Sequence, residues 1–185
     1  MLIKVFGAAV QGIDAITVTI EVNSSRGIRF FLVGLPDSAI RESHERIVSA
    51  LLCIGLKFPS RQIIVNMAPA DIRKEGAAYD LPLAIGILAS AGMIRSDRLP
   101  DFMIMGELSL DGSLQPIKGV LSIAMLAKRS GFEGLILPKS NAQEAAVIEG
   151  LPVYGVENIS QVINFFNGES TLEPTEHQTH MFQQQ

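Results

Sequence analysis

Residues 61–93 read RQIIVNMAPADIRKEGAAYDLPLAIGILASAGM, and this stretch decides the fold class. Its first part, Arg61–Met67, is rich in β-branched residues and predicts a strand. Its last part, Leu81–Met93, is apolar on every side, which predicts a helix buried in the centre of the domain. The polar loop Ala68–Ala78 joins these two buried elements. Because such loops hold functional groups on rigid supports, the segment Ile72–Pro82 is the first place to look for a site.

The residues before this stretch predict two strands and a helix. Ile13–Val22 and Ile28–Val33 alternate apolar and polar residues as strands do. Asp37 has the short acceptor oxygen of a helix N-cap, and apolar residues recur after it at helical spacing as far as Leu52. Asp80 is predicted to cap the central helix in the same way.

The residues after the central helix predict a hairpin and then alternating helices and strands. Asp111-Gly112 is typical of a tight turn between the strands Phe102–Leu110 and Ser113–Ile117. The later elements are predicted as a helix over 119–130, a strand at Leu135, a helix near Ala142–Glu149, a strand over Val153–Val156 and a helix over Ile159–Phe166. This order of elements indicates an α+β or mixed α/β domain.

The composition changes at Gly168. From there to the last residue the sequence is mainly polar and has no apolar periodicity. A segment of this kind predicts a linker. We therefore expect one folded domain over residues 1–167 and a linker over residues 168–185.

The composition also excludes several classes of protein. Hydrophobic residues make up 48% and charged residues 18% of the 185 residues, which excludes an intrinsically disordered chain. The net charge of −4 argues against a bulk electrostatic grip on nucleic acid. The longest apolar run, Leu81–Ile94, is shorter than the ~20 residues that span a bilayer. With no basic leader at the N-terminus, a cytoplasmic protein that makes no contact with a membrane is expected.

The usual catalytic and metal-binding signatures are absent from the sequence. No Gly-Lys dipeptide occurs, so this chain alone is not expected to hydrolyse ATP through a phosphate-binding loop. The single cysteine, Cys53, excludes a disulfide framework and a cysteine-based zinc site. No metal site and no cofactor are predicted for this chain.

Three blocks of sequence, in matching order, carry a resemblance to a known family. The blocks are Gly34–Asp37 with Glu42, Ser43 and Arg46, then Val65–Gly76 with Tyr79–Ala84, and finally Gly106–Ile117. Through them, residues 1–167 resemble the N-terminal domain of the Mg-chelatase-like AAA+ ATPases called ComM or YifB.

The resemblance implies both a fold and a setting. In that family the N-terminal domain is similar to the proteolytic domain of Lon, a small mixed sheet with packed helices and a left-handed βαβ crossover. The resemblance further implies that an AAA+ module follows this chain, that ATP and Mg²⁺ act there, and that the full-length protein is a hexamer. The family is associated with DNA recombination, namely branch migration during natural transformation.

The resemblance to Lon also bears on catalysis. Matching Glu75–Asp80 to the nucleophile loop of Lon places Ala78 at the catalytic serine. Matching Pro116–Leu121 to the second catalytic block places Leu121 at the catalytic lysine, with Lys118 three residues away. Because alanine has no oxygen to attack with and leucine cannot accept a proton, no catalytic residue is predicted. The expected role is a non-catalytic domain for oligomerisation or substrate guiding.

Two other functions remain open from the sequence. One is a serine–lysine peptidase with a displaced dyad, formed by Ser109 or Ser122 with Lys118. The other, which follows the family name, is an accessory domain of a metal chelatase, although the sequence has no cluster of metal ligands.

The basic residues give one candidate contact surface. They are scattered along the sequence, and only Arg73-Lys74 and Lys128-Arg129 are adjacent pairs. Arg73 and Lys74 lie on the loop that carries the nucleophile in Lon, so we expect them to contact DNA phosphates or a partner. The alternative is that both are ordinary solvated side chains.

Overall fold

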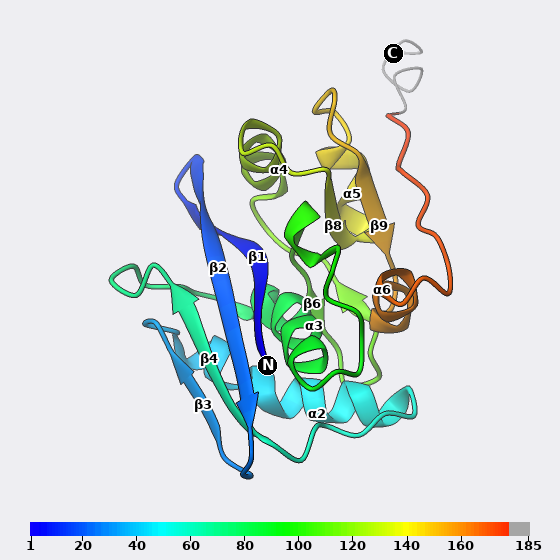
Figure 1. Cartoon of the computed structure of the whole chain (residues 1–185). Helices are drawn as coiled ribbons and strands as arrows, with labels where there is room; N and C mark the ends of the chain where they lie inside the picture. Colours follow the sequence, from blue (N-terminus) through cyan, green and yellow to red (C-terminus); the bar gives the residue numbers. More distant parts are fainter. Residues whose placement is uncertain (178–185) are drawn as a thin grey trace.

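In a computed structural model, which describes residues 1–177, the chain forms one seven-stranded sheet with helices packed on it (Figure 1). The strands of this sheet, in spatial order, are β3 (Phe30–Val33), β4 (Gln62–Ala68), β2 (Asp14–Ser25), β1 (Leu2–Gln11), β5 (Phe102–Ile104), β8 (Gly134–Pro138) and β9 (Val153–Val156). The pairs β1–β2 and β2–β4 are antiparallel, and the other four pairs are parallel. This confirms the predicted mixed α/β class.

The helices pack on the sheet around one central helix. They are α1 (Ser38–Arg41), α2 (Ser43–Cys53), the short 3-10 helix η1 (Ala77–Tyr79), α3 (Asp80–Ser90), η2 (Leu99–Asp101), α4 (Val120–Arg129), α5 (Lys139–Ala145) and α6 (Ile159–Phe166). Helix α3 lies against β1 and β2, and α2 packs on α3. Every residue of α3 is buried, as its uniformly apolar sequence predicts.

The second half of the chain differs from the sequence prediction at the hairpin. The strand expected over Phe102–Leu110 is divided: β5 ends at Ile104, and a separate two-stranded ribbon pairs β6 (Glu107–Leu108) with β7 (Leu114–Gln115). The turn between them is closed by the Asp111 carboxylate, which accepts hydrogen bonds from the amide and hydroxyl of Ser113. The predicted strand Val153–Val156 and helix Ile159–Phe166 are confirmed to the residue. The hand of the crossover stays a prediction.

The carboxylate of Asp80 is buried and does not cap its own helix, so the predicted N-cap role is wrong. Asp80 is the first residue of α3, and its carboxylate accepts hydrogen bonds from Arg46 Nε at 2.7 Å and Nη2 at 3.0 Å. It also accepts from the Ser43 hydroxyl at 2.5 Å and the Leu108 amide at 3.0 Å. One carboxylate thereby joins α2, α3 and β6. The pKa of Arg46 is raised, chiefly by this hydrogen bond.

Asp37 is an N-cap, as predicted. Its Oδ1 accepts a hydrogen bond from the Ile40 amide at the start of α1. Its Oδ2 accepts a second bond from the Gly76 amide at 3.0 Å, just before η1. The turn before Asp37 contains Gly34 with φ of 105° and Leu35 with φ of 58°. Asp37 therefore ties the turn after β3 to the loop that begins the central helix.

The segment after Gly168 lies along the edge of the sheet rather than apart from it. The Thr175 amide donates to the Val153 carbonyl at 2.7 Å, and Pro174 forms a bridge with Tyr154 of β9. Leu172 packs against the hydrophobic core. Figure 1 shows this segment running beside β9 and α6. For the part of the predicted linker that the structure describes, the contacts are those of a docked strap; residues 178–185 lie outside the described residues.

None of the helices within residues 1–177 has the length and apolar character needed to cross a lipid bilayer.

The close packing of the Gly34 turn gives a first prediction. A Cβ added to Gly34 would lie 2.3 Å from the Met67 carbonyl oxygen, whereas one added to Gly92, which also has positive φ, would meet nothing within 4 Å. Gly92→Ala should cost about 1–2 kcal/mol of unfolding free energy from backbone conformation alone. Gly34→Ala should cost at least about 1 kcal/mol more, because the backbone must also move apart. Urea unfolding measures both, and equal losses would contradict the packing described.

The Asp80 network gives a second prediction, with Asp37 as the matched control. Asp80→Ala should lower the free energy of unfolding by about 3–5 kcal/mol, because it leaves the Arg46 guanidinium without its buried partner. Asp37→Ala removes a helix cap and should cost about 0.5–2 kcal/mol. Chemical denaturation of both variants tests this order. A loss at Asp80 no larger than the loss at Asp37 would show that the buried ion pair contributes little.

Candidate functional site

A cavity of about 400 Å³ lies beside η1, at the N-terminal end of the central helix. Its lining residues come from the end of β1, the η1 loop, β6 and the approach to α4. They are Ala8, Val10, Glu75, Gly76, Ala77, Ala78, Tyr79, Met105, Glu107, Pro116, Ile117, Lys118 and Ile123. The cavity therefore joins the two segments that the sequence resemblance matched to the catalytic blocks of Lon.

The walls of the cavity are fixed by backbone contacts. The Gly106 amide donates to the Ala78 carbonyl at 2.8 Å, and the Leu81 amide donates to the Gly106 carbonyl at 3.0 Å. These two bonds clamp η1 and the start of α3 to the segment between β5 and β6. On the opposite wall, Val10 packs so closely over Gly119 that an added Cβ would lie 2.7 Å from a Val10 methyl carbon. The loop before α4 is held against β1 in this way.

The chemistry available in the cavity is limited to a few groups. Its only hydroxyl is that of Tyr79, which is buried, and burial is the main reason that the pKa of Tyr79 is raised. The nearby charges of Asp37 and Glu75 raise it further, so the phenol stays protonated. The remaining polar side chains are Glu75, Glu107 and Lys118. Such a site can bind a partly polar ligand, but it lacks an activated serine, threonine or cysteine nucleophile.

Of the two positions matched to the Lon dyad, only one lies at the cavity. Ala78 lines it, whereas Leu121 is 41% exposed on α4 and is not among the lining residues. Lys118 lines the cavity in its place. A lysine thus lines the same cavity as Ala78, which the sequence match did not predict, but position 78 itself carries no hydroxyl.

The serines of the alternative, displaced dyad lie away from this cavity. The Ser122 hydroxyl donates to the Ile13 carbonyl at 2.8 Å. The Ser109 oxygen accepts a bond from the Gln115 side chain at 2.7 Å. Neither serine lines the cavity with Lys118. The geometry gives no support to the displaced dyad.

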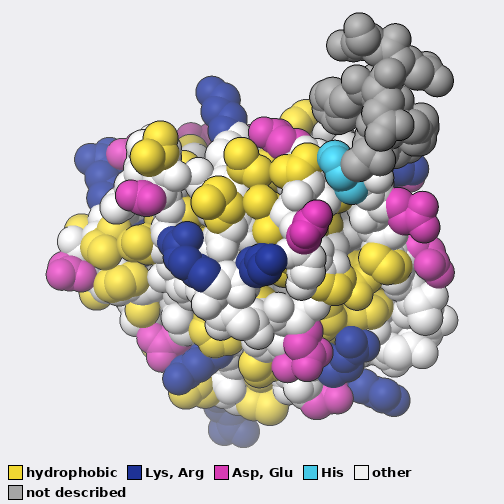
Figure 2. Space-filling view, turned by 90° about the horizontal axis from the view of Figure 1, so that it is seen from above, with side chains coloured by type: hydrophobic (Ala, Val, Ile, Leu, Met, Phe, Trp, Pro, Cys, Tyr) yellow, Lys and Arg dark blue, Asp and Glu magenta, His cyan; other side chains and the backbone are white. Residues whose placement is uncertain are grey.

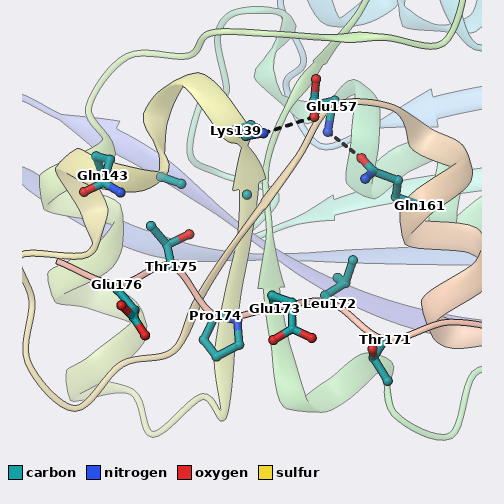
Figure 3. A pocket seen from close by; sticks show the side chains of 12 residues that line it. Lys139, Gln143, Glu157, Gln161, Thr171, Leu172, Glu173, Pro174, Thr175 and Glu176 are labelled. Carbon is teal, nitrogen blue, oxygen red and sulfur yellow. Dashed lines mark hydrogen bonds and ion pairs between the residues drawn. The ribbon is translucent and has the colours of Figure 1, made fainter. Parts of the chain in front are cut away.

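A second cavity, of about 500 Å³, lies between the C-terminal strap Thr171–Glu176 and helix α5 (Figure 3). Two of its four charged residues, Lys139 and Glu157, form an ion pair. Lys139 pairs with Glu157 at 3.2 Å, and the Gln161 side chain accepts a bond from the Glu157 amide at 2.6 Å. Glu173 and Glu176 add negative charge on the strap side. This cavity lies between the strap and the edge of the sheet, and the residues that line it do not form a recognisable catalytic arrangement.

The structure contradicts the predicted surface role of Lys74. This side chain is buried, and its ammonium donates to the carbonyls of Gly34 at 2.8 Å and Met67 at 2.6 Å, and also to that of Pro69. Burial lowers the pKa of Lys74, while the charge of Asp71 acts in the opposite direction. Lys74 cannot contact DNA or a partner, because the three carbonyls surround its ammonium. It ties the loop before η1 to β4 and to the turn after β3.

Arg73 lies apart from Lys74 despite being adjacent in sequence. Its side chain is 70% exposed and forms a loose pair with Glu75, at 3.4 Å. Arg73 is therefore the one member of the predicted basic pair that a ligand can reach.

The sequence analysis did not identify Glu107 as a residue of the site, because Glu107 lies in a strand too short to show any periodicity. Within residues 1–177, no three His, Cys, Asp or Glu side chains come together as a metal site.

The buried cation gives a third prediction. Lys74→Met keeps most of the aliphatic length of the side chain but leaves three carbonyls without a donor, at about 1–3 kcal/mol for each buried group. We expect a loss of several kcal/mol in the free energy of unfolding by urea. The neighbouring Arg73→Ala should stay within about 0.5 kcal/mol, because Arg73 is exposed. Equal and small effects of the two variants would mean that Lys74 is a solvated surface residue after all.

Comparison with known proteins relates this geometry to a family. Residues 20–141 match the family model described as subunit ChlI of Mg-chelatase. The competence protein ComM of Haemophilus influenzae is 40% identical over 169 residues, which is 91% of this chain and 33% of ComM. The uncharacterized protein YifB of Escherichia coli is 36% identical over 166 residues, which is 89% of this chain and 33% of YifB.

A more distant relative supports the likeness to Lon. Lon protease 2 of Bacillus subtilis is 29% identical over 128 residues, which is 69% of this chain and 23% of that protease. The chain spans about one third of the length of ComM and YifB. The family match covers the η1 loop, β6 and the approach to α4, which line the cavity, but not the two lining residues of β1, Ala8 and Val10. This chain belongs to the Mg-chelatase subunit ChlI family, with ComM and YifB among its relatives.

Proposed function

We propose that this chain is the non-catalytic N-terminal domain of a ComM-like AAA+ ATPase, and that it serves oligomerisation and substrate guiding in DNA recombination. The process in question is branch migration during natural transformation. One observation carries the non-catalytic part: the cavity at the position of a peptidase site has Ala78 where a nucleophile would stand, and Tyr79 supplies its only hydroxyl. The name of the competence protein ComM supports the setting.

The remaining parts of the proposal concern the whole protein. ComM and YifB are about three times as long as the segment they share with this chain, which leaves room in them for a motor module. We place ATP and Mg²⁺ on such a module, following residue 185, and a homohexamer as the working assembly in the cytoplasm. This chain would contribute the rigid platform built around α3, and its cavity would serve binding rather than bond cleavage. No observation favours the metal-chelatase role, because residues 1–177 hold no cluster of metal ligands.

A fourth prediction tests the absence of peptidase activity. Incubation of residues 1–185 with a serine-directed fluorophosphonate should leave Ser109 and Ser122 unlabelled, and unfolded casein should stay intact. Neither serine lines the cavity with Lys118, and their hydroxyls bond instead to the Gln115 side chain and the Ile13 carbonyl. A Lon-type peptidase treated in parallel shows that the probe and the casein are competent. Labelling of either serine, or cleavage of casein that Lys118→Ala abolishes, would replace this proposal with the peptidase reading.

The motor part is tested on the intact protein. We expect Mg²⁺-dependent ATP hydrolysis that branched DNA stimulates, with the same stimulation lost when residues 1–177 are removed. If the truncated protein responds to branched DNA as the intact protein does, then this domain does not guide the substrate.

A further inference from the structure

Some Lys and Arg residues of this chain lie in long stretches of sequence that contain no acidic residue. A search for adjacent pairs of cations does not detect such stretches. Residues 22–36 and residues 46–70 contain no Asp or Glu. They hold five of the 15 Lys and Arg residues, namely Arg26, Arg29, Arg46, Lys57 and Arg61. The rest of the chain therefore has ten cations against all 19 acidic residues. The net charge of −4 hides two basic stretches.

The fold brings these two stretches to one end of the sheet. Ser25, the last residue of β2, pairs with Gln62, the first residue of β4. The Ile63 amide donates to the Arg29 carbonyl at 2.8 Å, and the parallel strand β3 then starts beside β4. Arg26, Arg29 and Arg61 therefore flank the same end of three neighbouring strands, the lower end in Figure 1.

Lys57 joins the same end through an aromatic cluster. The Phe58 and Phe30 rings lie 6.2 Å apart, and the His44 ring lies between them at 4.8 Å from Phe58 and 4.7 Å from Phe30. Lys57 directly precedes Phe58 and Arg29 directly precedes Phe30, so this cluster brings the backbone at Lys57 near the start of β3, where Arg29 lies. We call Arg26, Arg29, Lys57 and Arg61 the basic end of the sheet.

The four cations of the basic end are accessible and unneutralised. All four are exposed, and none is within 4.0 Å of a carboxylate in the part of the chain that the structure describes. By contrast, Arg46 pairs with the buried Asp80, and Lys139 pairs with Glu157. On the upper face, which Figure 2 shows, cations and carboxylates are interspersed. Other exposed cations, such as Arg41, Arg95 and Lys128, also lack an ion pair, so this end is distinguished by the gathering of four such cations where the two stretches without Asp or Glu meet.

Apolar groups lie beside the cations. Ile28, between Arg26 and Arg29, is 90% exposed, and Phe31 is 41% exposed on the open face of β3. Phe31 is paired in register with Ile64 of β4, which is also exposed. Cations next to an exposed aromatic ring are the combination that binds single-stranded nucleic acid, because the cations meet phosphates and the ring stacks on a base. Three of the four cations are arginines, whose planar fork matches phosphate oxygens.

We propose that the basic end of the sheet is a binding surface for the phosphate backbone of single-stranded DNA. The proposal rests on the proposed function in a DNA-processing protein, and it assigns the DNA contact to a surface other than the Arg73-Lys74 loop. We commit to DNA because a row of four cations complements a polyanion and the neighbouring Phe31 adds a ring on which a base can stack, and docking of a second copy is an outcome of the test. Binding is sequence-independent, since phosphates and stacking carry it.

The test compares two triple variants that remove the same charge. The first is Arg26→Ala, Arg29→Ala and Arg61→Ala. The control is Arg41→Ala on α1, Arg95→Ala between α3 and η2, and Lys128→Ala on α4, which are three exposed cations. Fluorescence anisotropy with a labelled single strand, at about 50 and about 200 mM salt, gives the affinity and its salt dependence. Thermal melts of both variants confirm that each remains folded. Phe31→Ala probes the stacking contact.

Under the proposal, the first triple variant weakens binding at the lower salt by roughly 10-fold or more and makes the salt slope about 2 units shallower. The control triple changes the affinity by less than about 2-fold, and Phe31→Ala weakens binding without changing the salt slope. Equal losses in both triples would mean that net charge alone governs binding and would overturn the assignment. So would the absence of any binding by the unmodified chain at the lower salt.

Two further outcomes separate this proposal from the proposed function. If the intact protein shows DNA-stimulated ATP hydrolysis that the first triple leaves unchanged, the surface is wrong while the function stands. If the first triple changes sedimentation of the chain but not its DNA affinity, the basic end docks a second copy, and the DNA assignment is overturned. If the intact protein ignores DNA altogether, both proposals fail.

Discussion

The requirement to neutralise the buried carboxylate of Asp80 organises this domain. A carboxylate without solvent is tolerated only where charge and hydrogen bonds compensate its lost hydration, and here Arg46, Ser43 and the Leu108 amide do so together. These three partners come from α2 and β6, two elements that both contact the central helix. Because α3 is apolar on every side, hydrophobic burial does little to fix its rotation about its own axis, whereas these hydrogen bonds hold its first residue in one position. The polar contact therefore specifies an arrangement that hydrophobic burial alone would leave degenerate.

The loop before α3 contains a buried charge of the opposite sign, the ammonium of Lys74, which is likewise satisfied by hydrogen bonds. Lys74 turns inward and satisfies three backbone carbonyls at the ends of β3 and β4, and Asp37 binds the Gly76 amide two residues later. The loop is thus held at Lys74, at Gly76 and at Asp80 by contacts with different elements. A wall fixed at so many points gives the cavity beside η1 a stable shape. Rigid walls without a nucleophile are suited to recognition, which is the basis on which we propose a binding role.

The sequence predicted most elements that depend on periodicity, but it missed the strand β1 (Leu2–Gln11) and placed α5 (Lys139–Ala145) several residues too late. It also missed the contacts that depend on tertiary placement. The buried helix α3, the strand Val153–Val156 and the helix Ile159–Phe166 follow from the spacing of apolar residues, and the structure confirms them. Asp80 was predicted as a cap because the rule for caps considers only neighbouring residues, whereas its actual partners lie 28 to 37 residues away. Lys74 was predicted as exposed because charged side chains usually are. Only the fold shows that three carbonyls converge on it.

The strap also depends on tertiary placement, which the sequence alone does not show. Polar composition predicted a linker at Gly168, but the free edge of β9 offers hydrogen bonds to any extended chain, and residues up to Thr175 use them. Composition does not show which strand edges are unpaired.

The basic end could not be found from adjacent pairs of cations, because its members are separated by up to 35 residues in the sequence. Only strand pairing brings them together. The signal that was available is the absence of acidic residues from 22–36 and 46–70. Because salt screens exposed charges beyond about 10 Å, a phosphate responds to the local cluster far more than to the net charge of the chain. An acidic protein can therefore hold DNA, provided that its cations are gathered on one surface and its carboxylates lie elsewhere.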